Sequence, residues 1–190
     1  MAAPAPAARP SAIAALRDIY NSRDDRRLVT LESPRKALKI GVDTFDFTLT
    51  SREGGYVYLL MVGSDGQTFD LLFPNQLDRN NQIDPGGALR LPRSAWQLTV
   101  EGPPGRDTLL AVVTDNPRDF SAAGLKPSGP FSEVQAAAAK DIQLVTSATL
   151  GARAVEDECS SPAASTRNLA IRKRCSTGYG AALLEIEEAR

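Results

Sequence analysis

The chain of 190 residues contains no histidine, only two cysteines and only one tryptophan. Without histidine, the usual serine-protease, cysteine-protease and metalloprotease sites cannot be assembled, and the commonest metal ligand is missing. The 22 Lys and Arg residues nearly balance the 23 Asp and Glu residues, which leaves a net charge of −1. That balance predicts neither a nucleic-acid-binding surface nor a general attraction to anionic membranes.

Long apolar runs and phosphate-binding loops are also absent from the sequence. No run reaches the roughly eighteen apolar residues of a transmembrane helix, so the sequence predicts no membrane span. The glycine-rich segment 102–108 lacks the Lys-Ser/Thr ending of a nucleotide-binding loop, and we interpret it as a turn. Together these absences predict a protein that is not an enzyme and needs no cofactor or metal.

The two cysteines, Cys159 and Cys175, lie in one short segment rich in Ser, Thr and Pro. An even and minimal count predicts a single disulfide, which would place the domain in an oxidising compartment. A closed loop of about 16 residues would contribute roughly 3 kcal/mol to stability. The alternative is a pair of reduced, buried thiols in a cytosolic protein.

Residues 1–10 are rich in Ala and Pro and are predicted to be a linker, so we expect the domain at 11–190 to be one part of a longer chain. Ser11 is placed to cap a helix that runs to about Asn21. Further on, Ser132 and Gln135 form the pattern of a capping box, which predicts a second helix over 132–149. Residues 152–190 carry the cysteines and a last predicted strand.

Between the two predicted helices, apolar residues recur at every second position, the period of a half-buried strand. Turn residues such as Gly54-Gly55 and Asp65-Gly66 separate these runs. The pattern predicts a mainly β (α+β) fold, an antiparallel sandwich or barrel-like sheet of about seven strands with two flanking helices. The apolar runs that can supply these strands lie near 29–31, 38–42, 45–50, 56–62, 69–73, 89–91, 96–100 and 109–113, and a last strand is predicted after the second helix at 179–186.

Candidate binding residues lie in the polar loop between the fifth and sixth of these runs. Asp78, Asn80, Gln82 and Asp84 stand at alternating positions, an arrangement similar to the start of a calcium loop. Ile83 stands where such a loop needs glycine, so we favour a structural loop over a calcium site. With Asp65 of the Asp-Gly hairpin, Asp78, Asn80 and Asp84 form a candidate binding loop, because binding residues often lie on loops held by a rigid scaffold.

Two groups of charged residues allow further interpretations. Several acids lie near strand ends, where a carboxylate pair could serve a glycosidase without histidine; ordinary surface acids are the favoured interpretation. A short basic patch beside Cys175 is either a charged edge that discourages aggregation or a contact for an acidic partner. The acids are Glu53, Asp65, Asp70, Glu101 and Asp107, and the basic residues are Arg167, Arg172, Lys173 and Arg174.

The stretch 39–75, KIGVDTFDFTLTSREGGYVYLLMVGSDGQTFDLLFPN, carries three linked motifs. They are Gly-Tyr-x-Tyr-Leu at 55–59, Asp-Gly at 65–66 and Leu-Phe-Pro-Asn at 72–75. With Asn81, Ile83, Gly86, Leu91-Pro92, Gly102-Pro103 and Gly105, they resemble the bacterial family called domain of unknown function 4384 over roughly 35–120. The tail, Tyr-Gly-Ala-Ala at 179–182 with Glu187-Glu188 and the cysteines, resembles a subset that forms the periplasmic C-terminal part of transmembrane Ser/Thr kinases associated with type VI secretion.

The resemblance implies a location and a partner, and it carries no catalytic residue over to this chain. It implies a periplasmic sensory or interaction domain that is tethered through its N-terminal linker. Its expected partner is an envelope or secretion-system protein or a cell-wall component. The alternatives are a free-standing periplasmic adaptor or immunity-like protein and, in a third class, a cell-wall hydrolase that uses only carboxylates.

Overall fold

The computed structural model describes residues 11–66, 68–118, 120, 125–135 and 178–190. In these ranges one helix, α1 (Ala12–Asn21), precedes all the strands. The strands are β1 (Val29–Glu32), β2 (Ala37–Lys39), β3 (Phe47–Ser51), β4 (Gly55–Val62), β5 (Thr68–Phe73), β6 (Gln82–Ile83), β7 (Ala88–Leu91), β8 (Gly105–Thr114), β9 (Lys126–Ser128), β10 (Phe131–Gln135) and β11 (Tyr179–Ala189).

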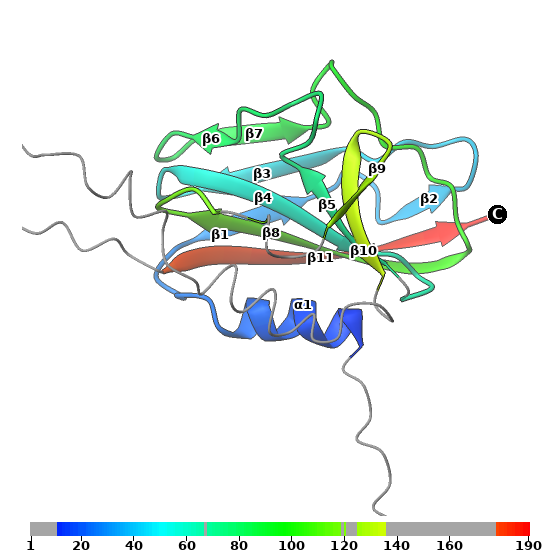
Figure 1. Cartoon of the computed structure of the whole chain (residues 1–190), viewed down its shortest axis with the longest axis horizontal. Helices are drawn as coiled ribbons and strands as arrows, with labels where there is room; N and C mark the ends of the chain where they lie inside the picture. Colours follow the sequence, from blue (N-terminus) through cyan, green and yellow to red (C-terminus); the bar gives the residue numbers. More distant parts are fainter. Residues whose placement is uncertain (1–10, 67, 119, 121–124, 136–177) are drawn as a thin grey trace, which may run out of the picture.

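The strands form two sheets, which are arranged like a sandwich (Figure 1). The small sheet has the order β1-β3-β7. The large sheet has the order β2-β11-β8-β4-β5-β10-β9, and β6 pairs with one end of β4. Neighbours are antiparallel except β2 and β11, which are parallel. Within the described ranges the large sheet does not close into a barrel, because β2 and β9 remain its two edges.

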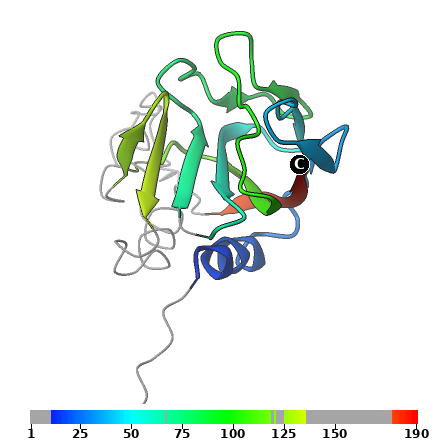
Figure 2. The same ribbon diagram turned by 90° about the vertical axis from the view of Figure 1, so that its right-hand side faces the viewer.

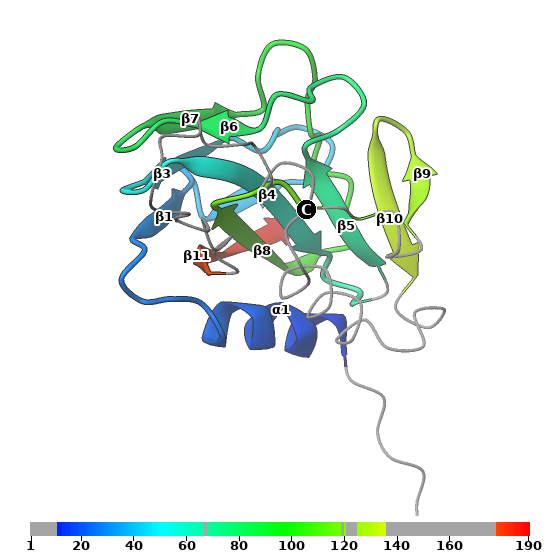
Figure 3. The same cartoon turned by 60° about the vertical axis from the view of Figure 1, so that its left-hand side comes forward.

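The large sheet is covered on both faces, which explains why its central strands are apolar throughout. Alternate residues of β4 face opposite ways: Val57 and Leu59 join the core between the two sheets, whereas Tyr58 and Leu60 pack toward α1. All four side chains are buried. Figures 2 and 3 show the resulting layers, with the small sheet above the large sheet and α1 below it.

Helix α1 confirms the helix predicted from Ser11. The N–H of Ala14 donates a hydrogen bond to the Ser11 side chain at 3.1 Å, which caps the first turn. Ala12, Leu16 and Ile19 are buried against the large sheet. No helix in the described ranges is long and apolar enough to cross a membrane.

The predicted helix over 132–149 is wrong at its start, because Phe131–Gln135 form strand β10. The Ser132–Gln135 pattern therefore is not a capping box. Strand β10 pairs along β5 and would otherwise leave its backbone groups without partners, so sheet pairing prevails over a local capping preference. Residues 136–149 lie outside the described ranges, and α1 is the one flanking helix within them.

The predicted strand at 96–100 is also not a regular strand, although its alternation is real. Trp96 and Val100 are buried and Gln97 and Thr99 are exposed, yet the segment makes only an isolated bridge, from Thr99 to Thr44. Short strands β6 and β9 occur where the sequence predicts loops. Both are too short to show a hydrophobic period.

Candidate functional site

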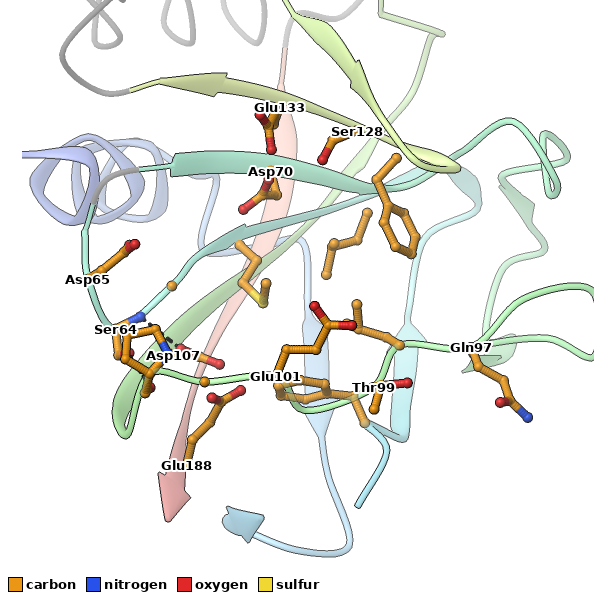
Figure 4. Close-up of a pocket in the computed structure, with 18 of the residues that line it drawn as sticks. Ser64, Asp65, Asp70, Gln97, Thr99, Glu101, Asp107, Ser128, Glu133 and Glu188 are labelled. Atoms are coloured by element: carbon orange, nitrogen blue, oxygen red, sulfur yellow. Dashed lines mark hydrogen bonds between the residues drawn. The ribbon is translucent and has the colours of Figure 1, made fainter. Parts of the chain in front are cut away.

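A pocket of about 460 Å³ is lined by residues of the large sheet and by the segment 97–103 (Figure 4). Its apolar lining includes Phe45, Met61, Leu72, Leu98 and Phe131. Its size falls within the range of small-molecule and side-chain binding sites. The polar lining is dominated by six carboxylates, and no Lys or Arg lines the pocket: the acids are Asp65, Asp70, Glu101, Asp107, Glu133 and Glu188.

Four of these acids stand at strand positions that face the core. Side chains two residues apart on a strand lie on the same face. Asp107 is two residues from the core residue Leu109 on β8, and Glu188 is two residues from the core residue Ile186 on β11, so both acids face inward. In the same way, Asp70 lies on the inner face with Leu72, and Glu133 lies on it with Phe131. Asp70 and Glu133 are directly opposite each other in the β5–β10 register. The strands thus place carboxylates where the sandwich would otherwise continue its apolar core.

The deepest acids of the pocket are Asp107 and Glu188, with 3% and 6% of their surfaces exposed. Burial, then a hydrogen bond and repulsion from Glu188, raise the pKa of Asp107 well above its usual range. The N–H of Ser64 also donates to Asp107 Oδ1 at 2.9 Å, which holds the carboxyl group in place. Two buried carboxyl groups in contact cannot both ionise cheaply, so they share a proton at neutral pH.

Ser64 packs closely against Gly105 at the start of strand β8, because the glycine has no side chain to keep it away. A Cβ atom at Gly105 would lie only 2.7 Å from the Cβ of Ser64. The Ser64 hydroxyl donates to the carbonyl of Pro103 at 2.7 Å. The two hydrogen bonds of Ser64 hold the residue before Asp65 against the start of β8, which positions Asp65 at the pocket.

Several acids outside the pocket are paired with arginines. In the described ranges, eight ion pairs join Arg side chains to such acids, among them Arg27 with Asp115 and Arg93 with Asp78. Among the described residues, no Lys or Arg forms such a pair with Glu101, Glu133, Asp107 or Glu188. These four pocket acids therefore differ from the acids that the eight arginine pairs neutralise.

The candidate binding loop does not come together as one site. Asp65 lies at the rim of the pocket, whereas Asp78 supports the fold: it accepts hydrogen bonds from Arg93 Nε at 2.7 Å and from the Trp96 indole at 3.0 Å. Asn80 accepts from the backbone of Gln82 within its own turn. Asp84 is exposed. In the described part of the chain, no three candidate ligands gather closely enough to hold a metal ion.

The strand-end acids considered for a carboxylate pair fare differently. Asp65, Asp70, Glu101 and Asp107 all line the pocket, whereas Glu53 does not. Sequence reasoning missed the other two acids of the pocket. Cys159, Cys175 and the basic patch at 167–174 lie outside the described residues, so the disulfide stays a prediction.

The missed acids differ in the signal that the sequence offers. Glu188 continues the alternation of the buried residues Leu184 and Ile186. The predicted strand ends at residue 186, whereas β11 runs to Ala189, and the alternation then places Glu188 on the inner face. Glu133 was hidden because its segment was assigned to a helix. A strand assignment would have placed it beside Phe131 on the inner face.

Comparison with known protein families gives one match. Residues 37–117 match the model of the domain of unknown function DUF4384. The match supports the family resemblance drawn from the sequence. Comparison with curated proteins finds no match, and comparison with solved structures finds none either.

The DUF4384 segment begins at β2 and ends just after β8. It carries four of the six acids of the pocket, including Asp107. Glu133 and Glu188 lie on strands outside the matched segment, as does α1. The pocket is therefore completed by parts of the chain that the family model does not cover.

Proposed function

We propose that this chain is a binding domain that acts as a sensor in the bacterial envelope without catalysis of its own, and that the acidic pocket is its binding site. The observation that carries the proposal is the row of inward-facing carboxylates around Asp107 and Glu188. Buried charge costs folding free energy, and such groups concentrate at functional sites. A pocket with an apolar floor and few, well-placed polar groups is the usual form of a binding site.

The cellular setting of the proposal is the periplasm, where the domain would be tethered through its N-terminal segment to a transmembrane Ser/Thr kinase associated with type VI secretion. The family match, the predicted linker at 1–10 and the predicted Cys159–Cys175 disulfide support this setting. Its ligand would be an envelope or secretion-system protein or a cell-wall component.

Location is tested with an antibody against the domain on native cells, blotted before and after protease treatment of spheroplasts. We expect a membrane-bound band much larger than this chain, cut only after the outer membrane is opened. A small, freely released band would favour a free-standing periplasmic adaptor or immunity-like protein. A band that stays protected inside the cytoplasm would overturn the envelope setting and the disulfide together.

Use of the pocket is tested by placing a photo-crosslinking amino acid at Gln97, an exposed residue of the pocket lining, in living cells. The matched control carries it at Asp84, which is exposed and does not line the pocket. We expect one envelope component to crosslink at Gln97 and not at Asp84. Equal labelling at both positions, or none at either, would count against the pocket as the binding site.

A carboxylate-only cell-wall hydrolase is the second candidate, favoured by the raised pKa of Asp107 in an open pocket. In glycosidases the two carboxyl groups stand about 5 Å or more apart with substrate between them. Asp107 and Glu188 are in hydrogen-bonding contact instead, which leaves no room for a sugar. Cleavage of peptidoglycan fragments that Asp107→Asn abolishes would establish this activity.

A further inference from the structure

Among the described residues, no Lys or Arg lines the acidic pocket, and this defines the chemistry of the ligand that we infer for it. Asp107 and Glu188 are both more than nine-tenths buried, line the pocket and have each other as their nearest charged partner. In the described ranges neither is paired with Lys or Arg, whereas buried or half-buried acids such as Asp78 and Asp115 are paired with arginines. A ligand with a positive charge supplies the missing partner.

The lining selects an organic cation over a metal ion. The carboxylates are spread around the pocket, and no three of them converge as metal ligands within the described part of the chain. Between them lie apolar side chains, notably Leu98 and Phe131. A Lys- or Arg-like group matches both kinds of lining. Its flexible alkyl stem can pack on the apolar side chains while its ammonium or guanidinium head contacts the carboxylates.

We propose that the pocket binds a basic polypeptide segment of the partner, with a Lys or Arg head group between Glu101, Glu133 and the Asp107–Glu188 pair. The alkyl stem of that side chain packs on Leu98 and Phe131. The proposal rests on the proposed function and adds the chemical class of the ligand. A polypeptide fits better than a free amine because the pocket is open at its rim, beside the β9–β10 hairpin.

Binding of the cation is linked to a proton. The buried pair holds one proton in the empty pocket, and an entering ammonium replaces it, so the proton leaves to solvent. The other charged groups that face the same space are Asp65, Asp70, Glu101 and Glu133, and Lys126 is opposite Glu133 in the β9–β10 register. Binding therefore tightens as pH rises from about 6 to about 8.

The test uses the full chain and a short fluorescent peptide in which lysine alternates with leucine, measured by anisotropy. A matched peptide carries glutamine in place of lysine. We expect Glu101→Gln and Glu133→Gln each to weaken binding of the lysine peptide roughly fivefold. Glu187→Gln removes the same charge from the outer face of β11, is exposed, and should leave binding unchanged.

Glu188→Gln probes the buried pair itself, and its fold is checked by the unfolding transition. We expect it to weaken the lysine peptide and to remove the tightening between about pH 6 and about pH 8. Equal affinity for the lysine and glutamine peptides, or equal loss in Glu133→Gln and Glu187→Gln, would overturn the proposal. Binding of Ca²⁺ in place of the peptide would also overturn it.

The two proposals fail in different ways. If the Gln97 crosslinker captures an envelope component while the lysine peptide does not bind, the pocket is a binding site and the cationic ligand class is wrong. If the lysine peptide binds but Gln97 captures nothing in cells, the pocket prefers cations and the sensory role is wrong.

Discussion

Replacing Asp107 by asparagine should remove most of the pH dependence of folding stability between about pH 5 and about pH 8. The folded protein raises the pKa of Asp107 from its ordinary 3.8 to about 8 through burial and contact with Glu188. Above pH 4 the unfolded chain has released this proton, whereas the folded chain still holds it. Stability is therefore fully present at low pH and is lost as the pH rises through the folded-state pKa.

The size of the effect follows from the shift. Each unit of pKa shift corresponds to about 1.4 kcal/mol, so the full shift would give at most about 6 kcal/mol. The pocket is open to solvent, which screens the two carboxyl groups. We therefore expect the wild-type protein to lose on the order of 2 kcal/mol between about pH 5 and about pH 8. The amide of Asp107→Asn can donate to Glu188 and accept from Ser64 N–H at every pH.

The sequence makes the assay unusually clean. With no histidine in the chain, the N-terminal amine and any reduced thiol are the only other ordinary groups that titrate near this window. The single tryptophan, Trp96, is buried, so urea unfolding can be followed by its fluorescence. Asp84→Asn, an exposed acid outside the pocket, is the control. An equal pH slope in Asp107→Asn and in the wild type would refute the shared proton.

Three further changes test the fold. Leu16→Ala, in the fully buried face of α1, should cost about 3 kcal/mol in urea unfolding, and an unchanged midpoint would mean that the helix does not pack on the sheet. Asp78→Asn leaves Arg93 without its buried charge partner and should cost roughly 2 kcal/mol. Alkylation of the denatured, unreduced protein should label neither Cys159 nor Cys175; two labels in the mass spectrum would exclude the disulfide.

The parts of the fold that the sequence predicts are those with a strong local period. Residues 56–62 are apolar on both faces because β4 lies at the centre of a sheet covered twice, and that pattern is visible without any structure. The register between strands is not visible in this way. Nothing in the sequence says that β11, which begins more than forty residues after β10 in the chain, pairs with β8 along ten positions or runs parallel to β2.

The candidate site shows the same division between local and long-range information. Asp65, Asp70, Glu101 and Asp107 were recognised as strand-end acids, but their convergence depends on pairings among β4, β5 and β8. Most acids of an antiparallel sheet point outward. An acid that points inward can be recognised only because it is two residues away from a buried apolar residue on the same strand. The loop at Asp78 misled because alternating polar residues also serve a structural turn, which here is held by Arg93.

The pocket and helix α1 use opposite faces of the same two strands. On β4, Met61 faces the pocket and Leu60 packs toward α1. On β8, Asp107 faces the pocket and Leu110 packs toward α1. A packed core of this kind moves between discrete arrangements rather than deforming continuously. In the proposed sensory role, a ligand can therefore change what the N-terminal segment transmits only if it binds two such arrangements with different affinity. In that role the acid pair would be the source of the difference, because an arrangement that separates the two carboxyl groups would favour a ligand whose positive charge replaces their proton.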